Sequence, residues 1–276
     1  MNNIRFLLIG DIVGAPGREV VTTLLPGIIA DYHIDFTIAN AENASDGFGL
    51  TQAVAQELFA SGINVLTSGN HIWDKKKIIT FISRNPRLLR PANFPSENPG
   101  KGSIVMTLDS EKRIGVLNVC GRVFMDSLDC PFRAAMREIE ALRKETAVIV
   151  VDIHAEATSE KIAMGWFLDG KVSAVLGTHT HVQTADERIL PQGTAYITDV
   201  GMTGSFDSVI GIKKEQAIGR FLTKMNVPLT PADHDKQLHG VVVEIDCSTG
   251  KSVLIERIQR RMECAALDTN SHCHAV

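Results

Sequence analysis

Short apolar runs alternate with amphipathic segments along the chain. The first run, 4–9, is apolar except for Arg5, which is typical of a strand buried on both faces. Helical segments follow most of these runs, so the pattern indicates an α/β fold. Further strands are predicted at 35–41, 64–67, 103–108, 113–119, 147–153, 172–176, 194–198, 240–245 and 252–258. Helices are predicted at 18–32, 52–60, 131–144, 161–168 and 213–222, the first of them broken or kinked at Pro26-Gly27.

The chain is long enough for one substantial core. It has 276 residues, of which 44% are hydrophobic, and no long linker rich in proline, glycine or serine divides it. We therefore expect a single domain over 1–276. Its last residues, 265–276, include His272, Cys273 and His274 and are expected to form a disordered tail.

Composition argues against several classes of function. A net charge of −4 and a pI near 6.1 disfavour a broad electrostatic grip on duplex nucleic acid. No apolar run has transmembrane length, and the first strand follows without the features of a signal peptide, so no membrane partner is expected. The five cysteines are odd in number and scattered, which suits reduced thiols and a cytoplasmic location.

The loop after the first strand, 10–18, is rich in glycine but matches no nucleotide-binding motif. It lacks the Lys-Ser/Thr of a phosphate-cradling loop and the Gly-x-Gly-x-x-Gly spacing. Its notable residue is Asp11, which comes directly after the strand.

Polar side chains also follow four other predicted strands. These residues are Glu42-Asn43, Asn70-His71, His154, and the pair His179 and His181. Ligands bind at the carboxyl edge of a parallel sheet, and crossover connections place successive strand ends on that edge. We therefore expect Asp11 and these residues to share one crevice.

Each residue also has a simpler interpretation. Asp11 could cap the following turn, Asn43 and Asn70 could be turn formers, and His154 could be a core histidine. The His-x-His pair alone is weak evidence for a metal site. The shared position at strand ends favours metal binding over these alternatives. Near His154, either Asp152 or Glu156 could support a ligand, or Asp152 could satisfy a buried backbone group.

The donor atoms of these candidate residues indicate which kind of metal site to expect. All candidates offer oxygen or nitrogen and none a thiolate, which disfavours a closed structural zinc site. They are too many for one tetrahedral ion and suit two ions that share a carboxylate and a water molecule. Two divalent ions, two carboxylates and a hydroxide sum to roughly +1, a charge that attracts a phosphate ester.

The ordered blocks Gly-Asp-x-Val, Glu-Asn, Gly-Asn-His and Gly-Thr-His-Thr-His resemble those of calcineurin-like metallophosphoesterases. Over nearly its whole length the chain resembles the bacterial YmdB branch of that superfamily, including blocks at 69–74, 90–95, 154–161 and 198–204. Val13 stands where the wider superfamily usually has histidine, and Glu42 where it usually has aspartate. The YmdB branch shares both departures.

This resemblance implies a four-layer α/β/β/α sandwich and a dinuclear centre. Metal 1 would be held by Asp11, Glu42, Asn43 and His181, and metal 2 by Glu42, Asn70, His154 and His179. Iron or manganese would be the first choice of metal, with zinc, cobalt or nickel as alternatives. The implied activity is hydrolysis of phosphodiesters, in YmdB-like members 2′,3′-cyclic nucleotides, by a metal-bridging hydroxide with His71 as proton donor.

Other functions remain open at this point. The same centre could serve a phosphomonoesterase, or the chain could be a metal-binding regulatory or RNA-associated protein with weak phosphatase activity. The expected partner is a small phosphodiester; RNA ends and a homo-oligomer are further candidates. Trp73 and Phe94 could stack on a base or merely pack, and Lys75–Lys77 could steer phosphate or simply begin a helix.

Overall fold

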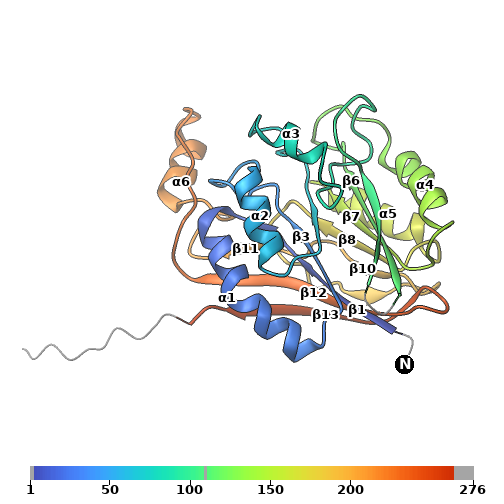
Figure 1. Ribbon diagram of the computed structural model, residues 1–276. Helices are drawn as coiled ribbons and strands as arrows, with labels where there is room; N and C mark the ends of the chain where they lie inside the picture. Colours follow the sequence, from blue (N-terminus) through green and yellow to red (C-terminus); the bar gives the residue numbers. More distant parts are fainter. Residues whose placement is uncertain (1–2, 109–110, 264–276) are drawn as a thin grey trace, which may run out of the picture.

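The computed structural model describes residues 3–108 and 111–263, which form two β-sheets and six α-helices (Figure 1). This confirms the predicted mixed α/β fold. The predicted tail, 265–276, lies outside the described residues. None of the described helices combines the length and apolarity that a membrane span requires.

The first sheet is built from both ends of the chain. Its central strand, β1 (Asn3–Ile9), pairs in parallel with β3 (Phe36–Asn40) and antiparallel with β12 (Lys236–Asp246), and β13 (Lys251–Arg261) pairs with β12. In spatial order the strands are β2 (Asp11–Ile12), β11 (Met202–Ser205), β12 (Lys236–Asp246), β1 (Asn3–Ile9), β3 (Phe36–Asn40) and β4 (Val65–Thr67), with β13 (Lys251–Arg261) beside β12.

The second sheet has four consecutive parallel strands at its centre and an antiparallel strand at each edge. In spatial order they are β5 (Ser103–Thr107), β6 (Arg113–Cys120), β7 (Ile149–His154), β8 (Ala174–Thr178), β10 (Ala195–Ile197) and β9 (Arg188–Ile189). The parallel strands are apolar along most of their length, because both faces of this sheet are covered.

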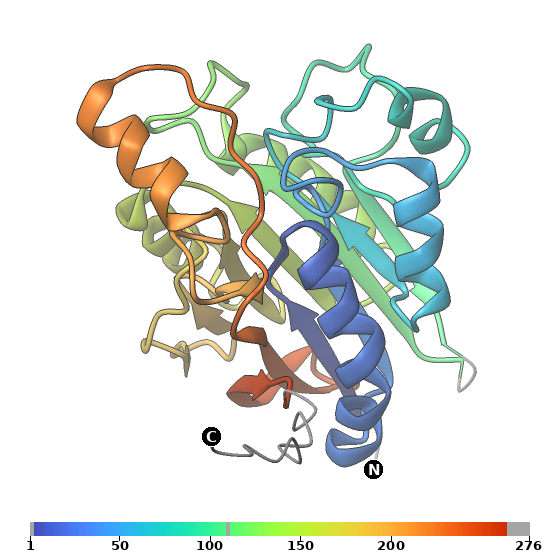
Figure 2. The same ribbon diagram turned by 90° about the vertical axis from the view of Figure 1, so that its left-hand side faces the viewer.

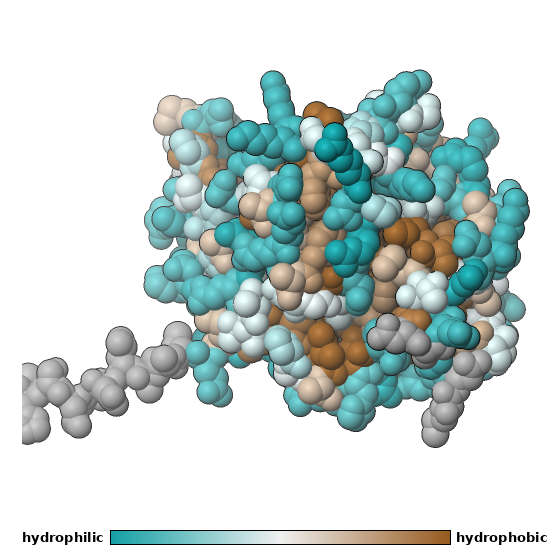
Figure 3. Space-filling model, in the orientation of Figure 1, coloured by the Kyte–Doolittle hydropathy of each residue, from teal (hydrophilic) through white to brown (hydrophobic). Residues whose placement is uncertain are grey.

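Three apolar clusters hold the sheets and helices together. One joins the first sheet to α1 (Gly14–Tyr32) and α2 (Gln52–Ala60), and a second lies between the two sheets. The third joins the second sheet to α4 (Pro131–Leu142) and α5 (Thr158–Leu168). The short α3 (Ile78–Ile82) covers one end of the molecule, and α6 (Lys214–Thr223) stands apart from the sheets at the left of Figure 1; Figure 2 shows the molecule from that side. Hydrophilic side chains cover most of the face shown in Figure 3, with apolar patches between them.

Two sequence expectations need correction. The first helix is not broken at Pro26: α1 continues through it, because Leu25 and Ile28 on either side are buried against the sheet. That packing outweighs the backbone hydrogen bond lost at proline. The polar strand ends also belong to two sheets rather than to one. Sequence periodicity finds strands but does not show which of them pair.

Candidate metal centre

The structure brings together all seven residues that the sequence nominates as metal ligands. Those from the first sheet are Asp11 on β2, Glu42 and Asn43 after β3, and Asn70 after β4. His154 is the last residue of β7, and His179 and His181 follow β8 in the second sheet. The site therefore lies where the ends of both sheets meet.

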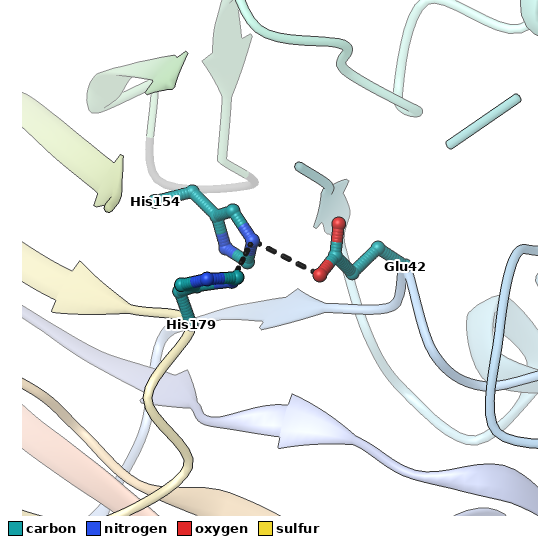
Figure 4. A group of neighbouring side chains, drawn as sticks. All are labelled: Glu42, His154 and His179. Atoms are coloured by element: carbon teal, nitrogen blue, oxygen red, sulfur yellow. Dashed lines mark hydrogen bonds and ion pairs between the residues drawn. The ribbon is translucent and has the colours of Figure 1, made fainter. Parts of the chain in front are cut away.

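Three of these side chains form a compact group. Ligand atoms of Glu42, His154 and His179 all lie within 4.8 Å of one another (Figure 4). His154 Nε2 is 2.9 Å from Glu42 Oε1 and 3.0 Å from His179 Nδ1. Asn70 Oδ1 lies 3.2 Å from the same His154 nitrogen. Donor atoms of Glu42, Asn70 and His179 therefore all lie within 3.2 Å of His154 Nε2.

Glu42 is linked to the remaining donors through Asn43. Its Oε1 accepts a hydrogen bond from Asn43 Nδ2 at 3.3 Å, and that amide nitrogen lies 3.3 Å from His181 Nε2. The same imidazole nitrogen is 3.8 Å from Asp11 Oδ1. One carboxylate thus stands between two groups of donors.

Two buried oxygens at this site find no hydrogen-bond partner among the described residues. They are Asp11 Oδ1 and Asn43 Oδ1, and both side chains are almost completely buried. A buried acceptor without a partner costs roughly 1–3 kcal/mol, so such atoms are rare in native structures. A cation would satisfy both, and carboxylate, amide and imidazole are suitable ligands for first-row transition metals. The residues present therefore fit a metal centre.

Burial and the neighbouring charges shift the pKa values of Glu42, His154 and His179. Burial disfavours the ionised carboxylate of Glu42, but the charge of His154 and a hydrogen bond from it lower the Glu42 pKa to about 2. Burial likewise disfavours imidazolium, but the charges of Glu42 and Asp11 raise the pKa of His154 to about 9. Burial and the neighbouring His154 charge lower the pKa of His179 to about 3. Metal binding at His154 would displace its proton, because only neutral imidazole is a ligand.

A chain of hydrogen bonds orients His154. Thr178 Oγ1 donates to Asp152 Oδ1 at 2.7 Å, and His154 Nδ1 lies 2.9 Å from Thr178 Oγ1 and 3.2 Å from Asn40 Nδ2. That arrangement directs Nε2 toward Glu42. Of the alternatives for Asp152, the structure supports a carboxylate that acts through hydroxyl groups, since it also accepts from Thr67. Burial raises the pKa of Asp152 to about 6.

Glu156 has the corresponding place beside His179. Its Oε2 lies 3.2 Å from His179 Nε2, which leaves His179 Nδ1 facing His154.

Both histidines after β8 adopt positive φ angles, 100° for His179 and 64° for His181. Side chains other than glycine rarely adopt this conformation unless their surroundings enforce it.

Two aspartates enforce that turn. Asp11 Oδ2 accepts from the backbone N–H of His179 at 3.1 Å. Asp199 Oδ2 accepts from the backbone N–H and the hydroxyl of Thr180, and from Lys161 Nζ at 2.7 Å. Lys161 and Asp199 are fully buried. Sequence reasoning missed this pair because 38 residues separate them and neither belongs to a recognised spacing.

His71 lies beside the centre rather than within it. Its backbone N–H donates to Glu42 Oε2 at 3.0 Å, and its Nδ1 lies 2.8 Å from Asp74 Oδ2. The ring of Phe48 meets His71 edge-on at 5.2 Å. His71 also lines a cavity of about 170 Å³ together with Glu42 and His179. Asp74 was not predicted, although its position three residues after His71 is a local signal.

The other side chains left open by the sequence have structural contacts. Trp73 and Phe94 pack on each other with ring centroids 6.4 Å apart. Lys75 forms an ion pair with the exposed Asp46 at 3.1 Å. These contacts favour the packing interpretation for the aromatic pair and a surface ion pair for Lys75.

Comparison with known proteins identifies the family. A sequence model described as "YmdB-like protein" matches residues 7–258. The chain belongs to the YmdB-like family. This confirms the resemblance found in the sequence.

Individual relatives match most of the chain. The 2′,3′-cyclic-nucleotide 2′-phosphodiesterase of Bacillus subtilis (strain 168) is 52% identical over 255 residues, which cover 92% of this chain and 96% of that protein. The structure of a hypothetical protein from Thermus thermophilus superimposes with a TM-score of 0.88 and 40% identity, covering 94% of this chain and 100% of that one. A novel phosphatase from Mycoplasma pneumoniae gives a TM-score of 0.89 and 36% identity, covering 95% and 94%.

Proposed function

We propose that this chain is a metal-dependent phosphodiesterase that hydrolyses 2′,3′-cyclic nucleotides at the centre around Glu42. The carrying observation is the buried group of Glu42, His154 and His179, with acceptor oxygens of Asp11 and Asn43 beside it that no described residue satisfies. The activity named for the 52% identical Bacillus subtilis protein supports the choice of substrate.

The donors divide into two sets that share Glu42. We assign metal 1 to Asp11, Glu42, Asn43 and His181, and metal 2 to Glu42, Asn70, His154 and His179. The position of Glu42 Oε1, between His154 and Asn43, supports the shared role. Iron or manganese remains the first choice, with zinc, cobalt or nickel as alternatives. When bound, such ions act as Lewis acids and make water a nucleophile at neutral pH.

His71 is assigned as the proton donor to the leaving oxygen. Its Nδ1 is engaged by Asp74, which orients the ring and leaves Nε2 as the nitrogen that can transfer a proton. Its position beside the cavity, in contact with Glu42 through the backbone, keeps it close to the reacting phosphate without making it a ligand.

The proposal extends to architecture and location. We assign the fold to the four-layer α/β/β/α sandwich. The three apolar clusters support this assignment, because they lie between successive layers of helices, first sheet, second sheet and helices. Pairing of β1 with β12 unites both ends of the chain and supports a single domain. The free thiols of Cys120, Cys130 and Cys247 support a cytoplasmic location. RNA ends and a homo-oligomer remain sequence-based expectations.

A substrate panel tests the activity. Metal-loaded protein is expected to hydrolyse cyclic and linear phosphodiesters faster than phosphomonoesters at matched concentration. A monoester is a dianion, and the described residues that line the cavity of about 170 Å³ include no lysine or arginine to compensate its second charge. The measurement is kcat/KM for adenosine 2′,3′-cyclic phosphate, a linear dinucleotide and adenosine 3′-monophosphate. Faster turnover of the monoester would contradict the proposal and favour a phosphomonoesterase.

A further inference from the structure

A strained isoleucine stands at the mouth of the candidate site. Ile210 and Gly211 are the central residues of a tight turn closed by hydrogen bonds in both directions between Val209 and Ile212. Both central residues have positive φ, 46° for Ile210 and 96° for Gly211. Turns of this type favour asparagine, aspartate or glycine, and a β-branched residue there is an outlier.

Neither packing nor the backbone of the turn explains the isoleucine. Ile210 is 51% exposed, so burial offsets little of the strain. The carbonyl oxygen of Ile210 lies 2.9 Å from His181 Nδ1 and can accept its proton, but any residue at this position would supply that carbonyl. The apolar side chain therefore requires another reason, and strained residues of this kind are concentrated at functional sites.

Ile210 lies at the boundary between two cavities. The smaller, of about 170 Å³, contains His71, Phe48 and His179 in its wall. The larger, of about 530 Å³, lies between the turn and α6. Ile210, Ile212 and Leu229 line both, so aliphatic side chains continue from the centre outward past the turn to the outer cavity, whose wall also contains Arg220 and Lys224.

We infer that Ile210, together with Phe48 and Leu229, forms the subsite that receives the nucleobase of the substrate. This inference rests on the proposed function. In a 2′,3′-cyclic nucleotide the leaving oxygen belongs to the ribose, so protonation by His71 places the ribose and its base on the His71 side of the phosphate. A nucleobase is uncharged and presents apolar faces, which suits a wall of aliphatic and aromatic side chains.

A second cavity that His179 lines offers a matched comparison. Phe124 also has positive φ, 62°, and is 89% exposed. It lines a different cavity, of about 370 Å³, whose described wall includes Asn70 and Asp126 but not His71. A base placed there would lie away from the proton donor. The geometry therefore assigns the base to Ile210.

The test replaces each exposed residue by asparagine, which tolerates positive φ and removes the apolar side chain. The two probes are adenosine 2′,3′-cyclic phosphate and 1-O-methylribose 2′,3′-cyclic phosphate, which keep the same leaving oxygen but differ in the base. Ile210→Asn is expected to raise KM for the nucleotide about tenfold with a smaller change in kcat, and to lower the preference for nucleotide over base-free ester by a similar factor. Relief of strain should raise Tm by about 2–4 °C.

Phe124→Asn is expected to keep the wild-type preference between the two probes. The inference is overturned if Ile210→Asn keeps that preference, or if Phe124→Asn loses it instead. If wild-type protein with its metals bound hydrolyses neither probe, the proposed function is wrong, and the inferred subsite has no basis. These outcomes are distinguishable because the wild-type rate is measured first on both esters.

Discussion

Replacing Gly69 by alanine is expected to reduce metal content and to lower kcat on a cyclic nucleotide at least about 10²-fold. A Cβ atom at this position would lie 2.1 Å from His154 Cδ2, 2.3 Å from His154 Nε2 and 2.5 Å from Glu42 Oε2. Both side chains would have to move away from the point at which they converge. A misplacement of about 1 Å is sufficient to reduce catalysis by about two orders of magnitude.

Gly27→Ala is the matched control. An added Cβ at Gly27, on an exposed part of α1, meets nothing within 4 Å among the described residues, so this variant should keep full activity and gain up to about 1 kcal/mol of stability. Circular dichroism should show that Gly69→Ala remains folded. If folded Gly69→Ala keeps wild-type metal content and kcat, the described packing of Glu42 against His154 is wrong.

Replacing His71 by alanine should slow hydrolysis of a 2′,3′-cyclic nucleotide by roughly 10²–10⁴-fold, the usual contribution of general acid catalysis. The alkoxide that leaves from ribose is strongly basic and needs a proton in the transition state. A nitrophenolate is stable as an anion near neutral pH and needs none. The loss on bis(nitrophenyl) phosphate should therefore be much smaller, with metal content unchanged.

Asp74→Asn provides an internal comparison for this assignment. The amide can still accept a hydrogen bond from His71 Nδ1, but it is a weaker acceptor than the carboxylate and holds the ring less firmly. We expect a smaller loss than for His71→Ala, again selective for the cyclic nucleotide. Equal losses on both substrates in metal-replete His71→Ala would instead assign His71 to phosphate positioning or to support of Asn70.

Much of the candidate site could be predicted from the sequence because its residues follow strands. An apolar strand is recognisable from composition, and a polar residue directly after it is placed at a sheet end by local geometry alone. Asp11, Glu42, Asn43, Asn70, His154, His179 and His181 were all found in this way, and the structure places them together. Their roles as ligands remain predictions.

What the sequence did not predict depends on contacts between distant segments. Asn40, whose Oδ1 accepts from the backbone N–H of Glu42 at 3.1 Å, lies inside the strand predicted at 35–41 and belongs to no recognisable motif. The buried pair of Lys161 and Asp199 is equally invisible to periodicity. The sequence also did not predict that the polar strand ends belong to two sheets, because tertiary packing decides which strands pair.

Three short strands were not predicted for a different reason. Strands β2, β9 and β11 have two to four residues, too few for an alternating pattern. The strand that contains His154 was expected to end at 153, but β7 includes His154 because its backbone continues the pairing with β6 and β8. The turn of Ile210 violates the usual residue preference, so no rule of turn chemistry predicts it.

Elemental analysis of the purified protein and three variants tests the central claim most directly. Wild-type protein is expected to hold two transition-metal ions per chain, because the donors form two sets around Glu42. Glu42→Gln and His179→Ala should hold less metal, whereas His71→Ala should keep the wild-type content. Equal metal content in all four folded proteins, or no bound metal in the wild type after loading, would contradict a dinuclear centre built on these residues.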